Sequence, residues 1–114
     1  MLAKKYLLRD KKVFSALKFK GKKIRTGPFL MSYFMQFKQK ENNRFGFLVL
    51  AKNIAKATDR NKIKRKLKAI CFPFRNKKIN SSFWDLTLVT FNKAKKEDFE
   101  NLKKELNNFF NEKD

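Results

Sequence analysis

Side chains along residues 28–38 alternate between an apolar set and a mixed set, a period of two that is typical of a β-strand. The first set is Phe29, Met31, Tyr33, Met35 and Phe37, and the second is Leu30, Ser32, Phe34, Gln36 and Lys38. A second strand is predicted over residues 44–52, where the run Phe47-Leu48-Val49-Leu50 indicates burial on both faces. The polar residues Glu41-Asn42-Asn43 lie between the two patterns and predict a turn. We therefore expect these two strands to pair as a hairpin.

Apolar residues at spacings of three and four predict three helices. The first helix begins at Asp10, whose side chain can cap the free N–H groups, and ends near Gly21. The second spans residues 57–70 and is closed by Pro73. Its narrow apolar stripe consists of Ile63, Leu67 and Ile70. A last helix is expected to pack on the sheet through a stripe made of Phe99, Leu102, Leu106, Phe109 and Phe110.

The order of these elements predicts the fold class. Residues 83–91 form a third strong strand, and the pattern leaves room for a minor extra strand near Ile24. The order is then helix, two or three strands, helix, strand, helix, which indicates an α+β two-layer sandwich. Because 114 residues fit one domain with a modest core, we expect residues 1–114 to form a single domain.

Charge is distributed very unevenly along the chain. There are 30 Lys and Arg but only 10 Asp and Glu, so the net charge is +20. All of the excess precedes Lys93, because residues 93–114 contain six charges of each sign. A net charge this large attracts polyanions, so nucleic acid is the leading candidate for a partner and an anionic membrane surface is the second.

The densest cluster of charge lies on the helix predicted at residues 57–70. Between Lys52 and Lys68 there are eight cations and a single acid, Asp59. At about 100° per residue, the arc opposite the apolar stripe holds five polar residues, namely Arg60, Asn61, Lys64, Arg65 and Lys68. A charged helix face is usually only solvated, but such faces interleave acids with cations. The missing acids therefore favour binding to a polyanion, and the mixture of Arg, Lys and Asn suits structured RNA.

Composition argues against several other functions. Cys71 is the only cysteine and the chain has no His, so neither an internal disulfide nor a usual zinc site is expected. Without His, a hydrolase of the triad type is not supported, and Cys71 is interpreted as a small buried hydrophobe. The longest apolar run, residues 45–51, is too short to span a bilayer. We expect a cytoplasmic protein, and no residue is assigned as a metal ligand.

The helical segment also resembles the signature of a known family. Its sequence is Ala57-Thr58-Asp59-Arg60-Asn61-Lys62-Ile63-Lys64-Arg65-Lys66-Leu67-Lys68. This is similar to the pattern Ala-x-x-Arg-Asn-Arg-x-Lys-Arg-x-x-Arg of the protein component of bacterial ribonuclease P. Lys62 and Lys68 replace two Arg of that pattern, which keeps the charge but loses the bidentate geometry.

The resemblance extends through most of the chain. The run Leu48-Val49-Leu50-Ala51-Lys52-Asn53-Ile54 resembles the family's strand and its Ser-Lys-Lys-x-x-Gly-x-Ala lead-in, with Ala55 in place of the usual Gly. Phe14, seven residues before Gly21, resembles the first helix, and Phe29 resembles the aromatic start of the first strand. The implied fold is a mixed sheet with an unusual left-handed crossover between parallel strands, as in ribosomal protein S5 domain 2.

The resemblance implies a subunit of a ribonucleoprotein endonuclease that removes the 5′ leader from precursor transfer RNA. The implied partners are the catalytic RNA and the precursor, and the implied cofactor is Mg²⁺, bound mainly by the RNA subunit, which performs the hydrolysis. We infer no protein partner and no membrane. The residues expected to bind the RNA subunit are Lys52, Lys56, Arg60, Asn61, Lys62, Lys64, Arg65 and Lys68. The residues expected to line a leader cleft between the first helix and the sheet are Phe14, Leu17, Lys18, Phe29, Met31 and Tyr33.

Alternatives remain at this point. Phe14 and Phe29 fit ordinary core positions as well as a leader cleft. A small ribosomal or other structured-RNA-binding protein would share the charge and the size, although it has no reason to carry both the signature and its lead-in. A membrane-surface binder would need a broader exposed apolar face than the three-residue stripe provides.

Overall fold

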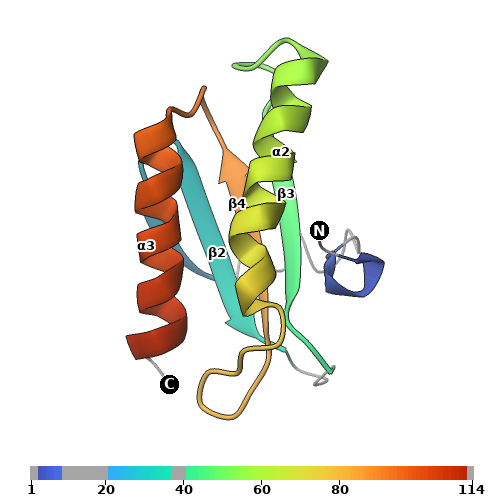
Figure 1. Ribbon diagram of the computed structural model, residues 1–114, viewed down its shortest axis with the longest axis vertical. Helices are drawn as coiled ribbons and strands as arrows, with labels where there is room; N and C mark the ends of the chain where they lie inside the picture. The colour runs from blue at the N-terminus through green and yellow to red at the C-terminus, as the bar shows by residue number, and fades with distance from the viewer. Residues whose placement is uncertain (1–2, 9–20, 37–40, 113–114) are drawn as a thin grey trace.

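The computed structural model describes residues 3–8, 21–36 and 41–112 (Figure 1). Both later helices and all three strong strands are confirmed, and the minor strand expected near Ile24 is present as β1. The first predicted helix, from Asp10 to Gly21, lies almost entirely outside the described residues. The elements are η1 (Lys4–Tyr6), β1 (Lys22–Thr26), β2 (Phe29–Met35), β3 (Arg44–Val49), α2 (Ala57–Cys71), η2 (Phe72–Phe74), β4 (Trp84–Thr90) and α3 (Lys96–Glu112).

The sheet has the strand order β1-β2-β4-β3. β2 pairs antiparallel with β1 and with β4, whereas β3 pairs parallel with β4. The predicted hairpin between β2 and β3 is therefore wrong, because β4 lies between them. The parallel connection from β3 through α2 to β4 agrees with the resemblance; its left-handed sense stays a prediction.

Asn42 and Asn43 explain why the local turn signal was misleading. Both side chains are buried and hold neighbouring backbone in place. Asn42 Nδ2 donates to the carbonyl of Lys5 at 3.0 Å. Asn43 Nδ2 donates to the carbonyls of Phe74 and Lys77, and its Oδ1 accepts from the Trp84 backbone N–H at 2.7 Å. Asn43 thus fixes the loop before β4, and Asn42 fixes the η1 segment, rather than a hairpin turn.

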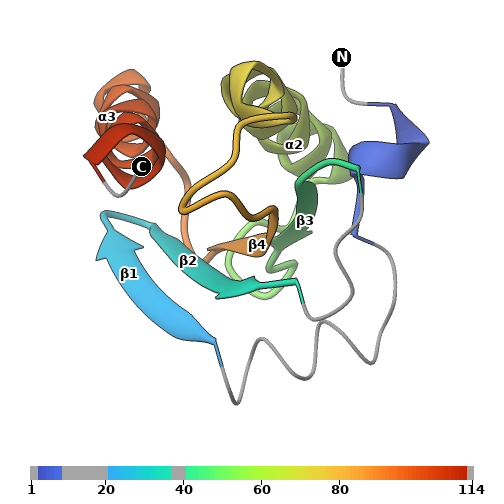
Figure 2. The same ribbon diagram turned by 90° about the horizontal axis from the view of Figure 1, so that it is seen from below.

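Helices α2 and α3 cover the same face of the sheet (Figures 1 and 2). All five stripe residues of α3 are buried, as are Ile63, Leu67 and Cys71 of α2. Alternation along β2 directs Phe29, Met31 and Tyr33 to this helix-covered face. Phe29 contacts Phe99 with ring centroids 5.4 Å apart, and Tyr33 contacts Phe109 at 4.5 Å. The α+β two-layer sandwich is confirmed, and its core lies between the sheet and the two helices.

The opposite face of the sheet carries the alternate residues of each strand. The register places Leu30 beside Val89 and Val89 beside Leu48, so these three side chains form an apolar row. Leu48 is 47% exposed, so the expectation that its strand is buried on both faces is wrong. The reason is that β3 is an edge strand and that both long helices of the described structure lie on the other side (Figure 2). We call this surface the open face, because neither long helix of the described structure lies on it. Of its described residues, Lys23, Arg25 and Leu48 are exposed, Leu30, Phe34, Arg44 and Val89 are half-buried, and Ser32, Gly46, Asp85 and Thr87 are buried.

Candidate nucleic-acid interface

Helix α2 is fixed to the sheet through a narrow apolar stripe, which orients its cations. Ile63 is 8% exposed and Leu67 is completely buried, so these two side chains anchor the helix. The residues opposite and beside the stripe therefore remain at the surface. Lys52, Lys56, Asn61, Lys62 and Arg65 are exposed, while Arg60, Lys64 and Lys68 are half-buried. The structure thus brings the eight predicted RNA-binding residues together on α2 and on the segment that leads into it.

Arg60 has a structural contact that the sequence did not reveal. Its Nη1 donates to the backbone carbonyls of Ile54 and Ala55, both at 2.8 Å. These carbonyls belong to residues 50–56, the lead-in between β3 and α2. One guanidinium nitrogen therefore ties the lead-in to the first turn of the helix. The other N–H groups of Arg60 have no partner among the described residues and remain able to bind a phosphate.

Within the described part of the chain, no ion pair neutralises the cations of α2. The one ion pair in the described ranges joins Arg44 to Asp85, at the end of β4 away from the start of α2. Asp59, the only acid of α2, forms none. Charges that are unpaired and close together produce a strongly positive local potential, which a polyanion would relieve. The surface is therefore suited to bind phosphates.

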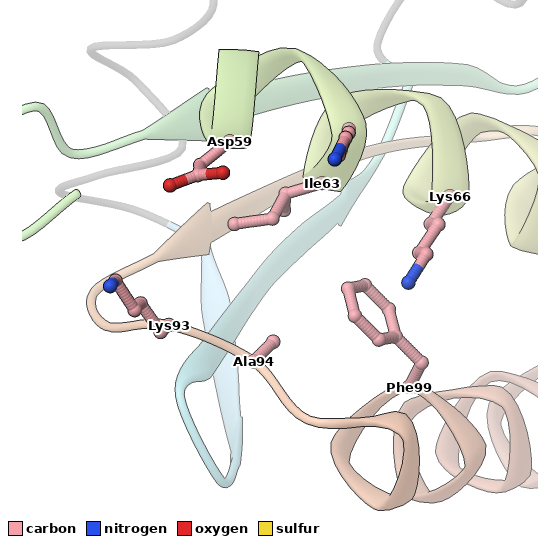
Figure 3. A pocket seen from close by; sticks show the side chains of 7 residues that line it. Asp59, Ile63, Lys66, Lys93, Ala94 and Phe99 are labelled. Atoms are coloured by element: carbon pink, nitrogen blue, oxygen red, sulfur yellow. The ribbon is translucent and has the colours of Figure 1, made fainter. Parts of the chain in front are cut away.

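Two hollows flank α2, one on each side. The first has a volume of about 270 Å³, lies toward α3, and is lined by Asp59, Lys62, Ile63, Lys66, Lys93, Ala94 and Phe99 (Figure 3). The second has a volume of about 230 Å³, lies toward β3, and is lined by Leu7, Leu8, Phe45, Gly46, Phe47, Lys64 and Lys68. Cations of the helix thus border depressions on both of its sides.

Comparison with known proteins identifies the family to which the chain belongs. The family model described as Ribonuclease P matches residues 2–114. The ribonuclease P protein component of Syntrophomonas wolfei is 35% identical over 105 residues, which cover 92% of this chain and 84% of that protein. The chain belongs to the ribonuclease P protein family. The family is that of the protein component of a ribonucleoprotein that processes transfer RNA, so association with a ribonuclease P RNA is implied.

Solved structures of ribonuclease P proteins have the same fold. The Staphylococcus aureus protein superposes with a TM-score of 0.77 at 20% identity, over 93% of this chain and 98% of that one. The Thermotoga maritima protein gives a TM-score of 0.66 at 24% identity, over 93% of this chain and 96% of that one. These two structures show that the chain has the fold of known ribonuclease P proteins.

The structure buries three of the six residues expected to line the leader cleft of this ribonuclease P protein. Phe29, Met31 and Tyr33 are only 0%, 1% and 6% exposed. They lie on the helix-covered face, where the first and third contact rings of α3, so a base could stack on them only if α3 moved. They are core residues in this structure. The other three expected residues, Phe14, Leu17 and Lys18, lie outside the described residues.

Sequence reasoning missed Lys66 and Lys93 as neighbours of one hollow. Lys62 and Lys66 are four residues apart, so helical spacing could have placed them on one flank of α2. Lys93 belongs to the connection between β4 and α3, and only the tertiary fold brings it to the same hollow.

Cys71 is confirmed as a small buried hydrophobe: it is completely buried, and burial raises the pKa of its thiol. No described helix is long and apolar enough to cross a membrane.

Proposed function

We propose that this chain is the protein subunit of a ribonuclease P, in which it binds the catalytic RNA and the 5′ leader of precursor transfer RNA. The observation that carries the proposal is the cationic surface of α2, which forms no ion pair within the described residues and consists of signature residues of the family whose model spans the chain. The RNA subunit performs the hydrolysis, and the protein positions the substrate. We propose that it does so in the cytoplasm.

The docking surface for the catalytic RNA is α2 with its lead-in. Arg65 and Asn61 are exposed on the side of the helix away from the apolar stripe. Arg supplies a planar donor fork for phosphate, and Asn supplies a donor and an acceptor for a base edge or a 2′-hydroxyl. The apolar stripe and the Arg60 contacts hold these groups on a rigid element. Little conformational entropy therefore has to be given up when RNA binds.

The leader is proposed to bind on the open face. This face offers a half-exposed aromatic ring at Phe34 and the apolar row that ends at Leu48, with Lys23 and Arg25 exposed at the β1 edge. Apolar and aromatic side chains accept unpaired bases with little sequence preference, and neighbouring cations follow the phosphates. The open face lies across the sheet from α2. One protein could therefore hold the catalytic RNA on one side and the leader on the other.

Mg²⁺ is proposed to be bound mainly by the RNA subunit. Within the described ranges, no group of three or more His, Cys, Asp or Glu side chains could hold a metal ion. We therefore assign no magnesium ligand to this part of the protein and derive no step of the reaction through the metal. The proposed contribution of the protein is binding and orientation.

Reconstitution tests the proposal directly. The protein is added to a cognate ribonuclease P RNA, and cleavage of precursor transfer RNA is followed across a magnesium series. We expect restored cleavage at low magnesium, because protein cations replace part of the screening that Mg²⁺ otherwise supplies. Absence of stimulation at every magnesium concentration would contradict the proposal.

A matched pair of variants assigns the effect to α2. Arg65→Ala and Lys104→Ala each remove one exposed cation, the first from α2 and the second from α3. We expect Arg65→Ala to weaken binding to the RNA subunit and to reduce the log-log salt slope by about 0.9 or less for each phosphate that the side chain neutralises. Lys104→Ala should leave both quantities nearly unchanged. Equal effects of the two variants would remove α2 from the interface.

A further inference from the structure

The hollow between α2 and α3 combines three elements that are distant in the sequence. Figure 3 shows Asp59, Ile63 and Lys66 projecting from α2, Lys93 and Ala94 from the connection that follows β4, and Phe99 from α3. Its volume of about 270 Å³ is close to the lower end of the range for pockets that hold a small organic ligand. A single nucleotide is within this size class.

Apolar and charged groups are segregated within the hollow. Ile63 and Phe99 are each only 8% exposed and belong to the core, so they form an apolar floor together with Ala94. Lys62, Lys66 and Lys93 supply three cations at the rim. The ammonium of Lys66 lies 5.0 Å from the centre of the Phe99 ring, a cation–π contact that holds this cation beside the floor.

Asp59 makes the hollow more selective than a simple anion site. Its carboxylate lines the same space as the three lysines, yet within the described structure it has no ion-pair partner. A bare phosphate would be repelled by this carboxylate. A nucleotide can also be attracted by Asp59, because an exocyclic amino group or a ribose hydroxyl can donate a hydrogen bond to a carboxylate. The combination of cations, apolar floor and acceptor therefore fits a nucleotide better than an inorganic anion.

We propose that this hollow binds one unpaired nucleotide of the catalytic RNA. The three lysines hold its phosphates, the apolar floor accepts part of the base or sugar, and Asp59 accepts a hydrogen bond from an amino or hydroxyl group. The inference rests on the proposed function, because it takes α2 as the docking surface for that RNA. Lys62 belongs both to the signature and to the hollow, so the site continues the proposed docking surface on the helix-covered side, away from the open face proposed for the leader.

The direction in which Asp59→Ala changes the affinity for the RNA subunit gives the first test. Asp59→Ala and Glu97→Ala each remove one acid from the first turn of a helix, but only Asp59 lines the hollow. If the hollow attracted RNA by charge alone, both variants would bind the RNA subunit as tightly as the native protein or more tightly. We expect Asp59→Ala to bind about tenfold more weakly, and Glu97→Ala to show no loss. Unchanged or tighter binding by Asp59→Ala overturns the proposal.

Lys93 gives a second test that does not depend on a helix terminus. Lys93 and Lys95 are both exposed and lie two residues apart, and only Lys93 lines the hollow. We expect Lys93→Ala to lower the log-log salt slope of RNA-subunit binding by about 0.7, the value for one neutralised phosphate of a single strand. Lys95→Ala should leave the slope unchanged. Equal slopes for the two variants overturn the proposal even if Asp59→Ala fails to fold.

Two further measurements separate this inference from the proposed function. Arg65 lies outside the hollow. If Arg65→Ala weakens binding to the RNA subunit while Asp59→Ala and Lys93→Ala bind it like the native protein, the nucleotide site in the hollow is refuted and the proposed function is not. Precursor affinity is then measured on holoenzyme preassembled at saturating protein concentration. We expect Lys93→Ala to match the native protein there. A loss confined to precursor binding would place the nucleotide in the substrate and overturn the assignment to the catalytic RNA.

Discussion

Arg60 shows how one residue of the signature contributes to both structure and binding. Its Nη1 donates to the carbonyls of Ile54 and Ala55, and these contacts fix the lead-in against the first turn of α2. A guanidinium has five N–H donors, so donors remain for a phosphate. Arg65 differs because its side chain is exposed to solvent on the far side of the helix. The two arginines of one signature therefore have separable roles.

Because Arg60 contacts backbone carbonyls and Arg65 is exposed, we predict that their substitutions change the free energy of unfolding by different amounts. We expect Arg60→Ala to lower the free energy of unfolding by about 1 kcal/mol, because two hydrogen bonds to loop carbonyls are removed, which means a fall of several degrees in Tm for a domain of this size. Arg65→Ala should change the stability by less than about 0.5 kcal/mol, as is usual for surface substitutions. Thermal unfolding followed by circular dichroism measures both. A Tm for Arg60→Ala equal to that of Arg65→Ala would show that the carbonyl contacts add no stability.

At the same scale, the sequence predicted residues whose role depends on local spacing. The surface position of the α2 cations follows from helical periodicity and the burial of Cys71 from the chemistry of a lone cysteine, and the structure agrees with both. Asn42 and Asn43 were misinterpreted because a buried Asn that binds distant backbone has the same local pattern as an Asn in a turn. Lys93 could not be predicted, since its neighbours in the hollow are remote in sequence.

At the scale of elements, the strands were predicted well and their pairing was not. Alternation defines where β2 lies and which of its residues share a face, but it does not say which face the helices cover. Phe29, Met31 and Tyr33 were correctly placed on one side, and only the packing of α3 shows that this side is the core. The strand order likewise depends on β4, which enters the sheet between β2 and β3 after the α2 crossover.

The open face leads to a prediction with a matched control. Leu48 and Met35 are the two exposed large hydrophobic residues of the described structure, at 47% and 50% exposure, but only Leu48 belongs to the open face. We expect Leu48→Glu to weaken holoenzyme affinity for precursor transfer RNA about tenfold, because it removes an apolar contact with an unpaired base and places a negative charge beside the phosphates. Affinity for mature transfer RNA should not change.

Met35→Glu adds the same charge at the end of β2, outside the open face, and should leave precursor affinity near the native value. Both variants replace half-exposed side chains, so both should remain folded. Equal losses for precursor and mature transfer RNA would indicate a general electrostatic effect and would argue against a leader site on the open face. An effect of Met35→Glu as large as that of Leu48→Glu would lead to the same conclusion.

At the scale of the whole molecule, charge opposes the compact fold. The net charge is +20, and the ion pair between Arg44 and Asp85 is the only one among the described residues. Arg44 donates to Asp85 through two nitrogens, at 2.8 and 2.6 Å, and Gln36 donates to the same carboxylate at 3.0 Å. This network satisfies one buried acid but leaves the surface cations to repel each other. The native state therefore gains stability from anything that screens or binds those cations.

Anion-dependent stability is the expected consequence. Tm should rise as sodium chloride is added, because the Debye length falls from about 30 Å at 0.01 M to about 10 Å at 0.1 M. At equal ionic strength, sodium sulfate should raise Tm further, since a divalent anion can bind between neighbouring lysines and is also excluded from apolar surface. Lys103→Glu with Lys104→Glu removes four units of charge from the exposed side of α3, so this double variant should start from a higher Tm in low salt and respond less to chloride. If native protein and double variant respond equally to chloride, then self-repulsion does not limit the stability of the fold, and relief of that repulsion cannot contribute to RNA binding.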